Sequence, residues 1–312
     1  MPACFYRFRF CGTCAASSHR FSGSSRVDSM NDYVQLTKPR ITWLILMSTG
    51  IGFFFGASSG WNWSLLLHTI IGTGLIASGT AALNQWWERG PDAFMERTQN
   101  RPLPSNRLSS HRALAFAILL SIAGFAELWI AVNPLTALLG LFTLCSYLFI
   151  YTPLKRLTPH STTVGAIPGA MPPVIGYAAG AGYLDAQACA LFAILFLWQF
   201  PHFHAIAWLY REDYERAGIR MLPVVDPTGE KTARQIFVYS LLLIPVSLVP
   251  RFLGMSGNVY LGGALILGLT YFYYAIRVLG DCSLQRARGV LMASIVYLPL
   301  LYVLMLVDRP AL

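Results

Sequence analysis

Charge is scarce in this chain. Only 12% of its 312 residues are charged, whereas 55% are hydrophobic; a soluble domain carries about 25% charged residues. This composition excludes an ordinary soluble globular domain, because most of the apolar surface must face lipid or neighbouring membrane spans. The sequence therefore predicts an all-α, polytopic membrane protein.

Acidic residues are scarcer than basic ones. The chain has 14 Asp and Glu against 23 Lys and Arg, which gives a formal net charge of +9. Such an excess is typical of proteins that meet nucleic acid, anionic lipid or an anionic substrate. No basic helix interleaved with polar residues occurs. We therefore expect membrane lipid and an anionic substrate as partners, and no nucleic acid.

Cysteine does not supply a disulfide framework. The six cysteines are scattered over the tail, the apolar runs and one loop, unlike the dense pattern of a disulfide-stabilised secreted domain. Cys11 and Cys14 form one C-x-x-C motif without a second pair or a histidine neighbour. We expect neither metal binding nor redox chemistry from it.

The first 32 residues are interpreted as an N-terminal tail ahead of a single membrane domain over residues 33–312. The first thirty of these residues hold four arginines, several serines and a single acid, Asp28, a composition that resembles a mitochondrial transit peptide. The alternative that we favour is that Met30 is the true start. In either case the tail is expected to be disordered and without chemistry.

Nine apolar runs approach the length of about 20 residues that a helical span requires. They cover residues 41–59, 63–87, 112–132, 135–152, 162–182, 187–209, 234–253, 258–279 and 290–307. The fifth run contains Pro168, Pro172 and Pro173 with several glycines. Because proline breaks a helix unless neighbours satisfy the freed carbonyls, we expect this span to be kinked, packed inside the protein and close to a cavity.

Positive charge alternates between the loops. Every Lys and Arg except Arg251 and Arg309 lies in the N-terminal segment or in the loops after spans two, four, six and eight. The positive-inside rule places these segments on the cytoplasmic side, and nine spans then leave the C-terminus outside. We expect a multi-pass protein of the bacterial inner (plasma) membrane, with the mitochondrial inner membrane as the alternative.

Carboxylates and arginines occur together in the loop after the second span. Asn84, Glu88 and Asp92 are spaced by four, which places side chains on one helix face, although Gly90-Pro91 should end or kink the helix before Asp92. Oxygen ligands of this kind suit Mg²⁺, which binds through one or two carboxylates plus substrate phosphates. An ordinary charged loop at a helix end is the alternative interpretation.

Two arginines follow in the same loop. Arg97 and Arg101 are also four residues apart, and guanidinium groups pair with phosphate oxygens. Together with the preceding carboxylates, they indicate a metal-bridged diphosphate.

These motifs resemble a known family. Asn84-x-x-x-Glu88-x-x-x-Asp92, followed by Arg-Thr-x-x-Arg-Pro-Leu over residues 97–103, is similar to the first acidic motif of the UbiA superfamily of intramembrane prenyltransferases. The resemblance extends from about residue 33 to residue 308. The segments at 36–40, 151–156, 165–176 and 198–204 carry it further. The last two distinguish the heme branch of the family from its quinone branch.

The resemblance implies a bundle of about nine helices that uses Mg²⁺ and a prenyl diphosphate. For the heme branch it implies transfer of a farnesyl group from farnesyl diphosphate to a vinyl group of heme B, giving heme O for heme A and terminal oxidase biosynthesis. Heme B is then a substrate and Mg²⁺ the cofactor. A heme A synthase or an oxidase-assembly protein is the candidate protein partner.

The resemblance also implies roles for the first loop and its neighbour. Glu88 and Asp92 would hold Mg²⁺ with Asn84 nearby as a catalytic group. The implied diphosphate contacts are Arg97, Arg101, Lys155 and Arg156. From position alone, the last two are equally well explained as anchors at a positively charged membrane face.

The second acidic motif of the family is expected beyond the sixth span. This chain departs from the usual aspartates four residues apart and offers Glu212, Asp213 and Glu215 instead. We assign Glu212 and Asp213 a role at a second metal or diphosphate position, with Asp213 as the metal ligand.

The Pro-His-x-His segment ahead of that motif admits three interpretations. His202 and His204 could ligate heme iron, act as a general base, or hydrogen-bond neighbouring helices. Alternate residues point to different helix faces, so both cannot easily ligate one iron. We assign both to heme binding, with His202 as the better candidate.

Two other interpretations of the whole chain stay open. A quinone-branch prenyltransferase would share the diphosphate site but take a small aromatic acid and would not need His202. A transporter or heme channel would also contain broken helices, but the polar residues here cluster at one face, and no clear repeat relates the halves. Glu127 and His68, near the other face, are expected to be structural.

Overall fold

The structure, a computed structural model, describes residues 29–57, 60 and 62–310, and within them it contains helices and no strands. The predicted N-terminal tail lies almost entirely outside the described residues. Its last three residues, 30–32, are already helical.

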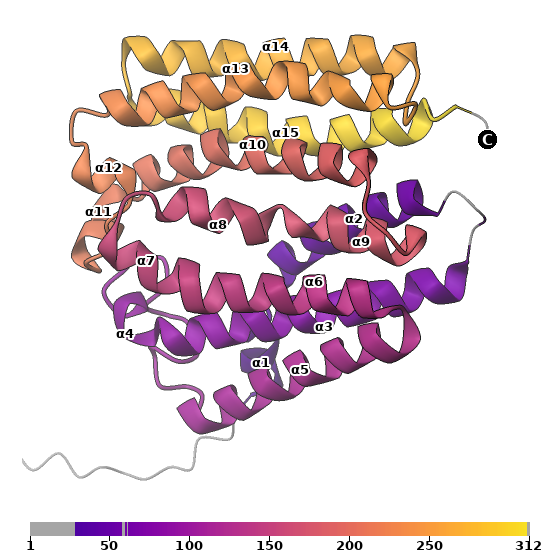
Figure 1. Cartoon of the computed structure of the whole chain (residues 1–312). Helices are drawn as coiled ribbons and strands as arrows, with labels where there is room; N and C mark the ends of the chain where they lie inside the picture. The colour runs from indigo at the N-terminus through magenta and orange to yellow at the C-terminus, as the bar shows by residue number, and fades with distance from the viewer. Residues whose placement is uncertain (1–28, 58–59, 61, 311–312) are drawn as a thin grey trace, which may run out of the picture.

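Figure 1 shows the long helices lying side by side, roughly parallel or antiparallel. In chain order the elements are α1 (Met30–Leu36), α2 (Pro39–Gly56), α3 (Trp63–Trp87), α4 (Arg89–Asp92), α5 (Ser110–Ala131), α6 (Pro134–Cys145), the π-helix η1 (Ser146–Tyr151), α7 (Thr152–Leu157), α8 (Ser161–Gly169), α9 (Met171–Ala181), α10 (Ala186–Leu209), α11 (Arg211–Arg216), α12 (Leu222–Val225), α13 (Glu230–Phe252), α14 (Asn258–Gly280) and α15 (Leu284–Val307).

Seven helical segments of the described part are long and apolar enough to cross a membrane. They match seven of the nine predicted spans and confirm a multi-pass membrane bundle. The first predicted span corresponds to the 18-residue helix α2, and the fifth to the two short helices α8 and α9. The long spans expose many large apolar side chains, as expected for surfaces that face lipid.

The fifth span is broken and buried, as its prolines and glycines predicted. Helix α8 ends at Gly169 and α9 begins at Met171, and every residue from Met171 to Ala179 is buried. The Nε2 of Gln199 donates a hydrogen bond to the carbonyl of Ala166, one turn before the break. A neighbouring helix therefore satisfies backbone near the interruption.

Helices α2 and α9 approach each other closely through glycines. A Cβ atom at Gly52 would lie 1.8 Å from the carbonyl oxygen of Pro173, and one at Gly176 would lie 1.8 Å from that of Thr49. Without side chains at these positions, the two backbones can touch, which is how small residues drive helix packing in membranes. This contact holds α2, and with it the start of the site described below, against the buried span.

We expect Gly52→Ala to destabilise the protein by about 1–3 kcal/mol or more, since the added methyl group overpacks against backbone that cannot move aside. Gly50 lies on the same helix, and a Cβ there would meet nothing within 4 Å. Gly50→Ala is therefore the matched control and should leave the melting temperature in detergent unchanged. Equal melting temperatures for both variants would contradict the α2–α9 contact.

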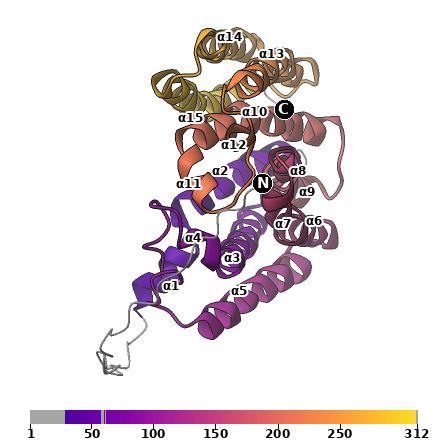
Figure 2. The ribbon, with the colours of Figure 1, turned by 90° about the vertical axis from the view of Figure 1, so that its left-hand side faces the viewer.

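The apolar core is divided between the two halves of the chain. One cluster is centred on α10, α13, α14 and α15, and another on α3, α5 and α6. Viewed along the helices, the bundle extends from α14 at one edge to α5 at the other, with α2 between the halves (Figure 2).

The short helices α4, α7, α11 and α12 gather at one end of the bundle, at the left of Figure 1. We call this the polar end, because the predicted charged loops after spans two, four and six meet there. The opposite end carries the short connections after α5, α9 and α13. The predicted clustering of polar loops on one face is thus present.

Candidate active site

A polar pocket of about 170 Å³ lies at the polar end of the bundle. It contains four cationic side chains and two carboxylates, contributed by segments far apart in the sequence. Its lining consists of Lys38, Asn84, Glu88, Asp92, Met95, Arg97, Thr98, Arg101, Tyr147, Tyr151, Lys155, Tyr214, Ile219 and Met221. Such a surplus of positive charge is suited to a multiply charged anion.

The three residues of the predicted acidic motif all line this pocket. Helix α3 ends at Trp87 and α4 begins at Arg89, so the helix is interrupted at Glu88, before Asp92, as Gly90-Pro91 predicted. The turn nevertheless continues, because the amide of Asp92 donates to the carbonyl of Glu88 at 2.9 Å. Asn84 also donates from Nδ2 to the Glu88 carboxylate at 2.8 Å. Spacing by four thus brings the motif together despite the interruption.

Each carboxylate of the motif is paired with a cation from another part of the site. Lys155 Nζ lies 2.9 Å from Glu88 Oε1 and 3.1 Å from Oε2. Arg101 Nη1 lies 2.7 Å from Asp92 Oδ2, and Asp92 is only 1% exposed. Burial alone would raise the pKa of Glu88, but the charge and hydrogen bonds of Lys155 outweigh it and lower that pKa. Glu88 is therefore held ionised.

Lys38, which was not assigned a role from the sequence, is a fourth cation of the pocket. Its Nζ lies 3.1 Å from Asn84 Oδ1. Its backbone has a φ of 48°, in the left-handed region that a non-glycine residue rarely adopts, immediately before Pro39. Strain of this kind clusters at functional sites. Burial, followed by the neighbouring charges of Arg101 and Lys155, lowers the pKa of Lys38 to about 7.

Two tyrosines were also missed, and a π-helix places them. The π-helix Ser146–Tyr151 directly precedes the short helix that carries Lys155. The rings of Tyr147 and Tyr151 lie 5.0 Å apart, and Lys155 Nζ is 5.9 Å and 4.6 Å from their centres. Single π-helical turns are frequent at functional sites. The aromatic faces stabilise and orient the ammonium group.

Arg97 is held at the pocket by aromatic rings rather than by a carboxylate. Its guanidinium carbon lies 4.9 Å from the ring centre of Tyr210 and 4.5 Å from that of Tyr214. Held over the two ring faces, the guanidinium group keeps its N–H donors available for a ligand. Arg97 is thus the pocket cation best prepared to bind an external anion.

Two of the predicted diphosphate and acidic-motif residues lie elsewhere. Arg156 is exposed and does not line the pocket, because adjacent residues of a helix point about 100° apart and Lys155 occupies the inward position. Glu212 is likewise exposed on α11 and outside the lining. Their assignment to the diphosphate site and to the second acidic motif stays a prediction.

Asp213 lies next to the pocket rather than in its lining. It is 7% exposed, and its Oδ1 accepts from the Glu96 amide at 3.2 Å and pairs closely with Arg216. Arg216 also contacts the Glu96 carboxylate at 3.1 Å. These bonds fasten the loop that carries Arg97 to helix α11. Its assignment as a metal ligand stays a prediction.

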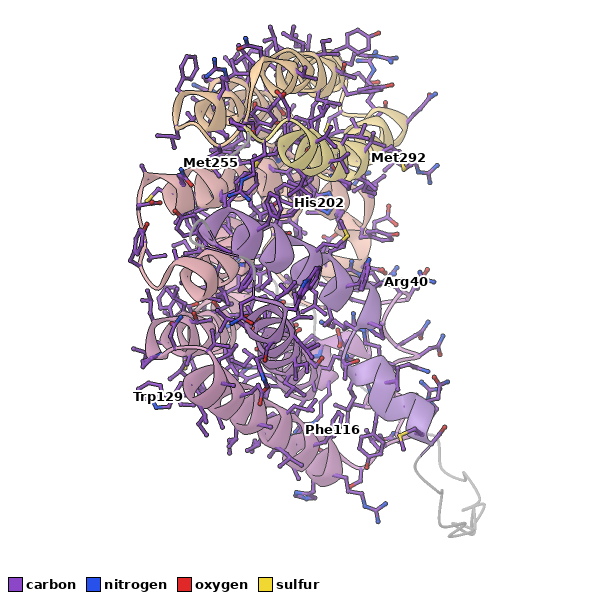
Figure 3. The ribbon with its side chains drawn as sticks, turned by 90° about the vertical axis from the view of Figure 1, so that its right-hand side faces the viewer. Arg40, Phe116, Trp129, His202, Met255 and Met292 are labelled. Atoms are coloured by element: carbon purple, nitrogen blue, oxygen red, sulfur yellow. The ribbon has the colours of Figure 1, made fainter. Side chains whose placement is uncertain are left out.

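The two histidines of α10 are directed to different surroundings. His204 is 2% exposed, its Nε2 lies 3.3 Å from Gln235 Oε1 on α13, and its buried Nδ1 has no partner among the described residues. His202 is partly exposed and lies between the ribbons of α15 and α2 in the view of Figure 3. Helix α10 packs against both of these helices. Of the two histidines, His202 is the one that is partly exposed.

Glu127 and His68 form a pair in the other half of the bundle. Glu127 Oε1 lies 2.7 Å from His68 Nδ1, across the contact between α5 and α3. Each satisfies the other, in line with the structural role expected from the sequence.

The donor set of the pocket fits a divalent metal that binds through substrate phosphates. Within the described part of the chain, no group of three His, Cys, Asp or Glu side chains could hold an ion by itself. Glu88 and Asp92 are carboxylates in one pocket with the amide oxygen of Asn84. Mg²⁺ commonly takes one or two carboxylates and completes its shell with phosphate oxygens and water. The residues present therefore suit Mg²⁺ together with a diphosphate.

Fold and site agree with the family that the sequence matches. The model of the UbiA prenyltransferase family matches residues 45–298, and the chain belongs to this family of membrane prenyltransferases. Among the relatives, the protoheme IX farnesyltransferase of Solibacter usitatus is 66% identical over 91% of this chain and 100% of its own length. That of Koribacter versatilis is 46% identical over 90% and 94%. The resemblance stated from the motifs is confirmed.

Solved structures share the fold at low identity. A digeranylgeranylglyceryl phosphate synthase has a TM-score of 0.76 and 16% identity, covering 90% of this chain and 98% of its own. A UbiA homologue from Archaeoglobus fulgidus, bound to GPP and Mg²⁺, has a TM-score of 0.62 and 16% identity, covering 88% and 99%. The described bundle thus has the UbiA fold.

Proposed function

We propose that this chain transfers a farnesyl group from farnesyl diphosphate to a vinyl group of heme B, giving heme O. The observation that carries the proposal is the pocket of four cations and two carboxylates at the polar end of a membrane bundle. The acceptor is proposed from the protoheme IX farnesyltransferases to which the chain is similar over nearly its whole length.

The charges of the pocket account for the first bond to break. The carbon–oxygen bond of farnesyl diphosphate breaks, diphosphate leaves with the electron pair, and an allylic cation remains. Arg97, Arg101, Lys155 and Lys38 supply positive charge where negative charge develops on the departing oxygens. When bound by Glu88 and Asp92, Mg²⁺ would add Lewis-acid stabilisation of the same diphosphate.

The vinyl group of heme B then donates its π electrons to the allylic carbon, and the new carbon–carbon bond leaves a cation on the former vinyl group. Addition of water and loss of a proton complete a hydroxyethylfarnesyl side chain. The apolar interior of the bundle suits the isoprenoid chain and excludes water before the carbon–carbon bond forms. Both substrates are lipophilic, which explains why the enzyme is embedded in a membrane.

His202 is the proposed contact to the heme iron. It lies seven residues before the end of α10 at Leu209, about 10 Å from the polar end at 1.5 Å per residue. A neutral imidazole nitrogen is a common iron ligand. His204 is buried against α13, and we therefore propose that its part in heme binding is to fix helix α10.

The wider cellular setting is also a proposal. The charge asymmetry of the loops supports an N-terminus on the cytoplasmic side of a bacterial inner membrane. A heme A synthase or oxidase-assembly protein would take the product onward, because heme O is the substrate for further oxidation in heme A formation.

The acceptor is tested by competition. Purified protein in lipid nanodiscs receives Mg²⁺, farnesyl diphosphate, heme B and 4-hydroxybenzoate together, and both products are quantified by mass spectrometry. We expect farnesylated heme and no farnesylated benzoate. Farnesylated benzoate alone would replace the heme assignment with a quinone-branch activity.

Lys38 predicts a pH dependence of prenyl diphosphate binding. Its pKa is lowered to about 7, whereas a bound diphosphate favours the ammonium form, so binding takes up a proton above pH 7. Affinity should fall as pH rises above 7, by up to about tenfold per unit, and this slope should vanish below pH 7. In calorimetric titrations with farnesyl diphosphate, the affinity of Lys38→Met should not change with pH in this way. The affinity of Arg40→Met, which alters an exposed arginine, should still fall above pH 7. Equal slopes in Lys38→Met and the unmodified protein would refute the role of Lys38.

A further inference from the structure

Ser294 of α15 forms hydrogen bonds with two residues of α10, Trp198 and His202, which lie four residues apart. Its Oγ lies 2.7 Å from His202 Nδ1, and its backbone carbonyl accepts a hydrogen bond of 2.9 Å from Trp198 Nε1. Ser294 is completely buried. The Trp198 indole stacks on the His202 ring with centres 4.6 Å apart and an angle of 22°. One residue of α15 therefore fixes the position of the imidazole and of the ring that supports it.

The hydrogen bonds of Ser294 determine which imidazole nitrogen carries the proton. The Ser294 hydroxyl lies 2.5 Å from the carbonyl oxygen of Leu291, one turn earlier, and a carbonyl can only accept. A side-chain hydrogen bond also joins Ser294 to Tyr271 of α14. The Tyr271 phenol can donate to one lone pair of the Ser294 Oγ, which leaves the single hydroxyl proton for Leu291. The Oγ must then accept from His202, so Nδ1 carries the N–H.

The opposite tautomer would be unfavourable here. If Nδ1 were the unprotonated nitrogen, Ser294 would have to donate to it, and two oxygen atoms would face each other at 2.5 Å without a shared proton. The other ring nitrogen, Nε2, consequently holds the free lone pair. Among the residues that the structure describes, Nε2 has no hydrogen-bond partner.

We propose that Ser294 is a positioning residue for heme binding, which acts by fixing His202 in the tautomer whose Nε2 can bind iron. This inference rests on the proposed role of His202 toward heme B. A hydrogen bond from Nδ1–H also makes the opposite nitrogen a stronger donor to a metal, and loss of such a partner typically lowers affinity about 10–100-fold. Trp198 contributes by keeping the ring plane in place.

The test uses heme B binding to the full-length protein in nanodiscs without farnesyl diphosphate, so that no turnover occurs. We expect Ser294→Ala to raise the Kd for heme B about tenfold. In the ferrous complex, the iron–histidine stretching band in resonance Raman spectra should shift to lower frequency. Ser294→Thr keeps the hydroxyl, so its Kd for heme B and its iron–histidine band should match those of the unmodified protein. Ser240→Ala is the matched control, because Ser240 is a buried serine of α13 whose hydroxyl has no partner in the described part of the chain.

The His202→Gln variant distinguishes the proposed iron-ligand role of His202 from the proposed positioning role of Ser294. If His202→Gln removes the iron–histidine band and Ser294→Ala behaves like Ser240→Ala, His202 is the ligand but the role of Ser294 is refuted. If His202→Gln keeps the band, the ligand assignment and the inference from it both fail. Should Ser294→Ala not fold, Ser294→Cys, which is close in size but a weaker acceptor, is expected to give an intermediate shift. An unshifted band there would equally refute the role of Ser294.

Discussion

Glu88→Gln is expected to lower kcat/KM for farnesyl transfer by a factor of about 10²–10³, the range seen when one preorganised electrostatic contact is removed from an active site. The exchange keeps the size of the side chain and removes its charge. Glu88 is ionised, bound by Asn84 and Lys155, and placed next to Asp92 in the pocket. The variant therefore loses both a proposed Mg²⁺ ligand and the partner that orients Lys155.

Steady-state rates of farnesylated heme formation at several Mg²⁺ concentrations measure this effect. A lost metal contact predicts that part of the rate returns as Mg²⁺ is raised. Glu215→Gln is the control, because Glu215 is an exposed carboxylate of α11 outside the pocket lining. A Glu88→Gln enzyme that retains more than a third of the normal kcat/KM would contradict the proposed role of Glu88.

Lys155→Gln is expected to have the second large effect, a loss of about 10²-fold in kcat/KM together with lower stability. The pair it forms with Glu88 is largely buried, with side-chain exposures of 12% and 14%. Breaking one side of a buried pair leaves the other charge uncompensated and costs on the order of 3 kcal/mol. Activity should fall in addition because the proposed contact of Lys155 with the departing diphosphate is lost.

The double variant Glu88→Gln/Lys155→Gln distinguishes a structural from a catalytic role of Lys155. Its melting temperature should recover toward that of the unmodified protein, since no unpaired charge is left, whereas its activity should stay as low as in the single variants. Arg156→Gln changes the exposed neighbour of Lys155 and should lose less than tenfold. Recovery of activity in the double variant would mean that Lys155 serves only to neutralise Glu88.

Much of the fold follows from patterns that lie within one stretch of sequence. Apolar runs predicted the spans, and the prolines around Pro172 predicted the broken helix α8–α9. The spacing of Asn84, Glu88 and Asp92 predicted a shared pocket, because residues four apart on a helix meet on one face. Local periodicity is sufficient for each of these inferences.

The site residues that the sequence did not predict are brought in by contacts between distant segments. Lys38 reaches the pocket through a left-handed backbone that no propensity indicates, and it contacts Asn84 across 46 residues of sequence. Tyr147 and Tyr151 face Lys155 only because a π-helix changes the helical register. Ser294 meets His202 across 92 residues. Such contacts are set by packing, and a regular helical repeat does not reveal them.

A second limit concerns Arg156, Glu212 and Asp213, none of which lines the pocket. Family motifs indicate which segment reaches the site, but which charged side chain of the segment faces inward depends on helix rotation and on competing partners. Lys155 rather than Arg156 meets Glu88. Asp213 is bound by Arg216 and the Glu96 amide. For charged clusters, the sequence identifies the segment more reliably than the residue.

The mass of the heme product tests the central claim most directly. Membranes that contain the protein are supplied with heme B, farnesyl diphosphate and Mg²⁺, and the extracted pigments are analysed by liquid chromatography and mass spectrometry. The account predicts a heme heavier by one farnesyl group plus water, absent from Glu88→Gln and Asp92→Asn membranes with equal amounts of folded protein. Unmodified heme B as the sole pigment from well-folded, membrane-inserted protein would contradict it.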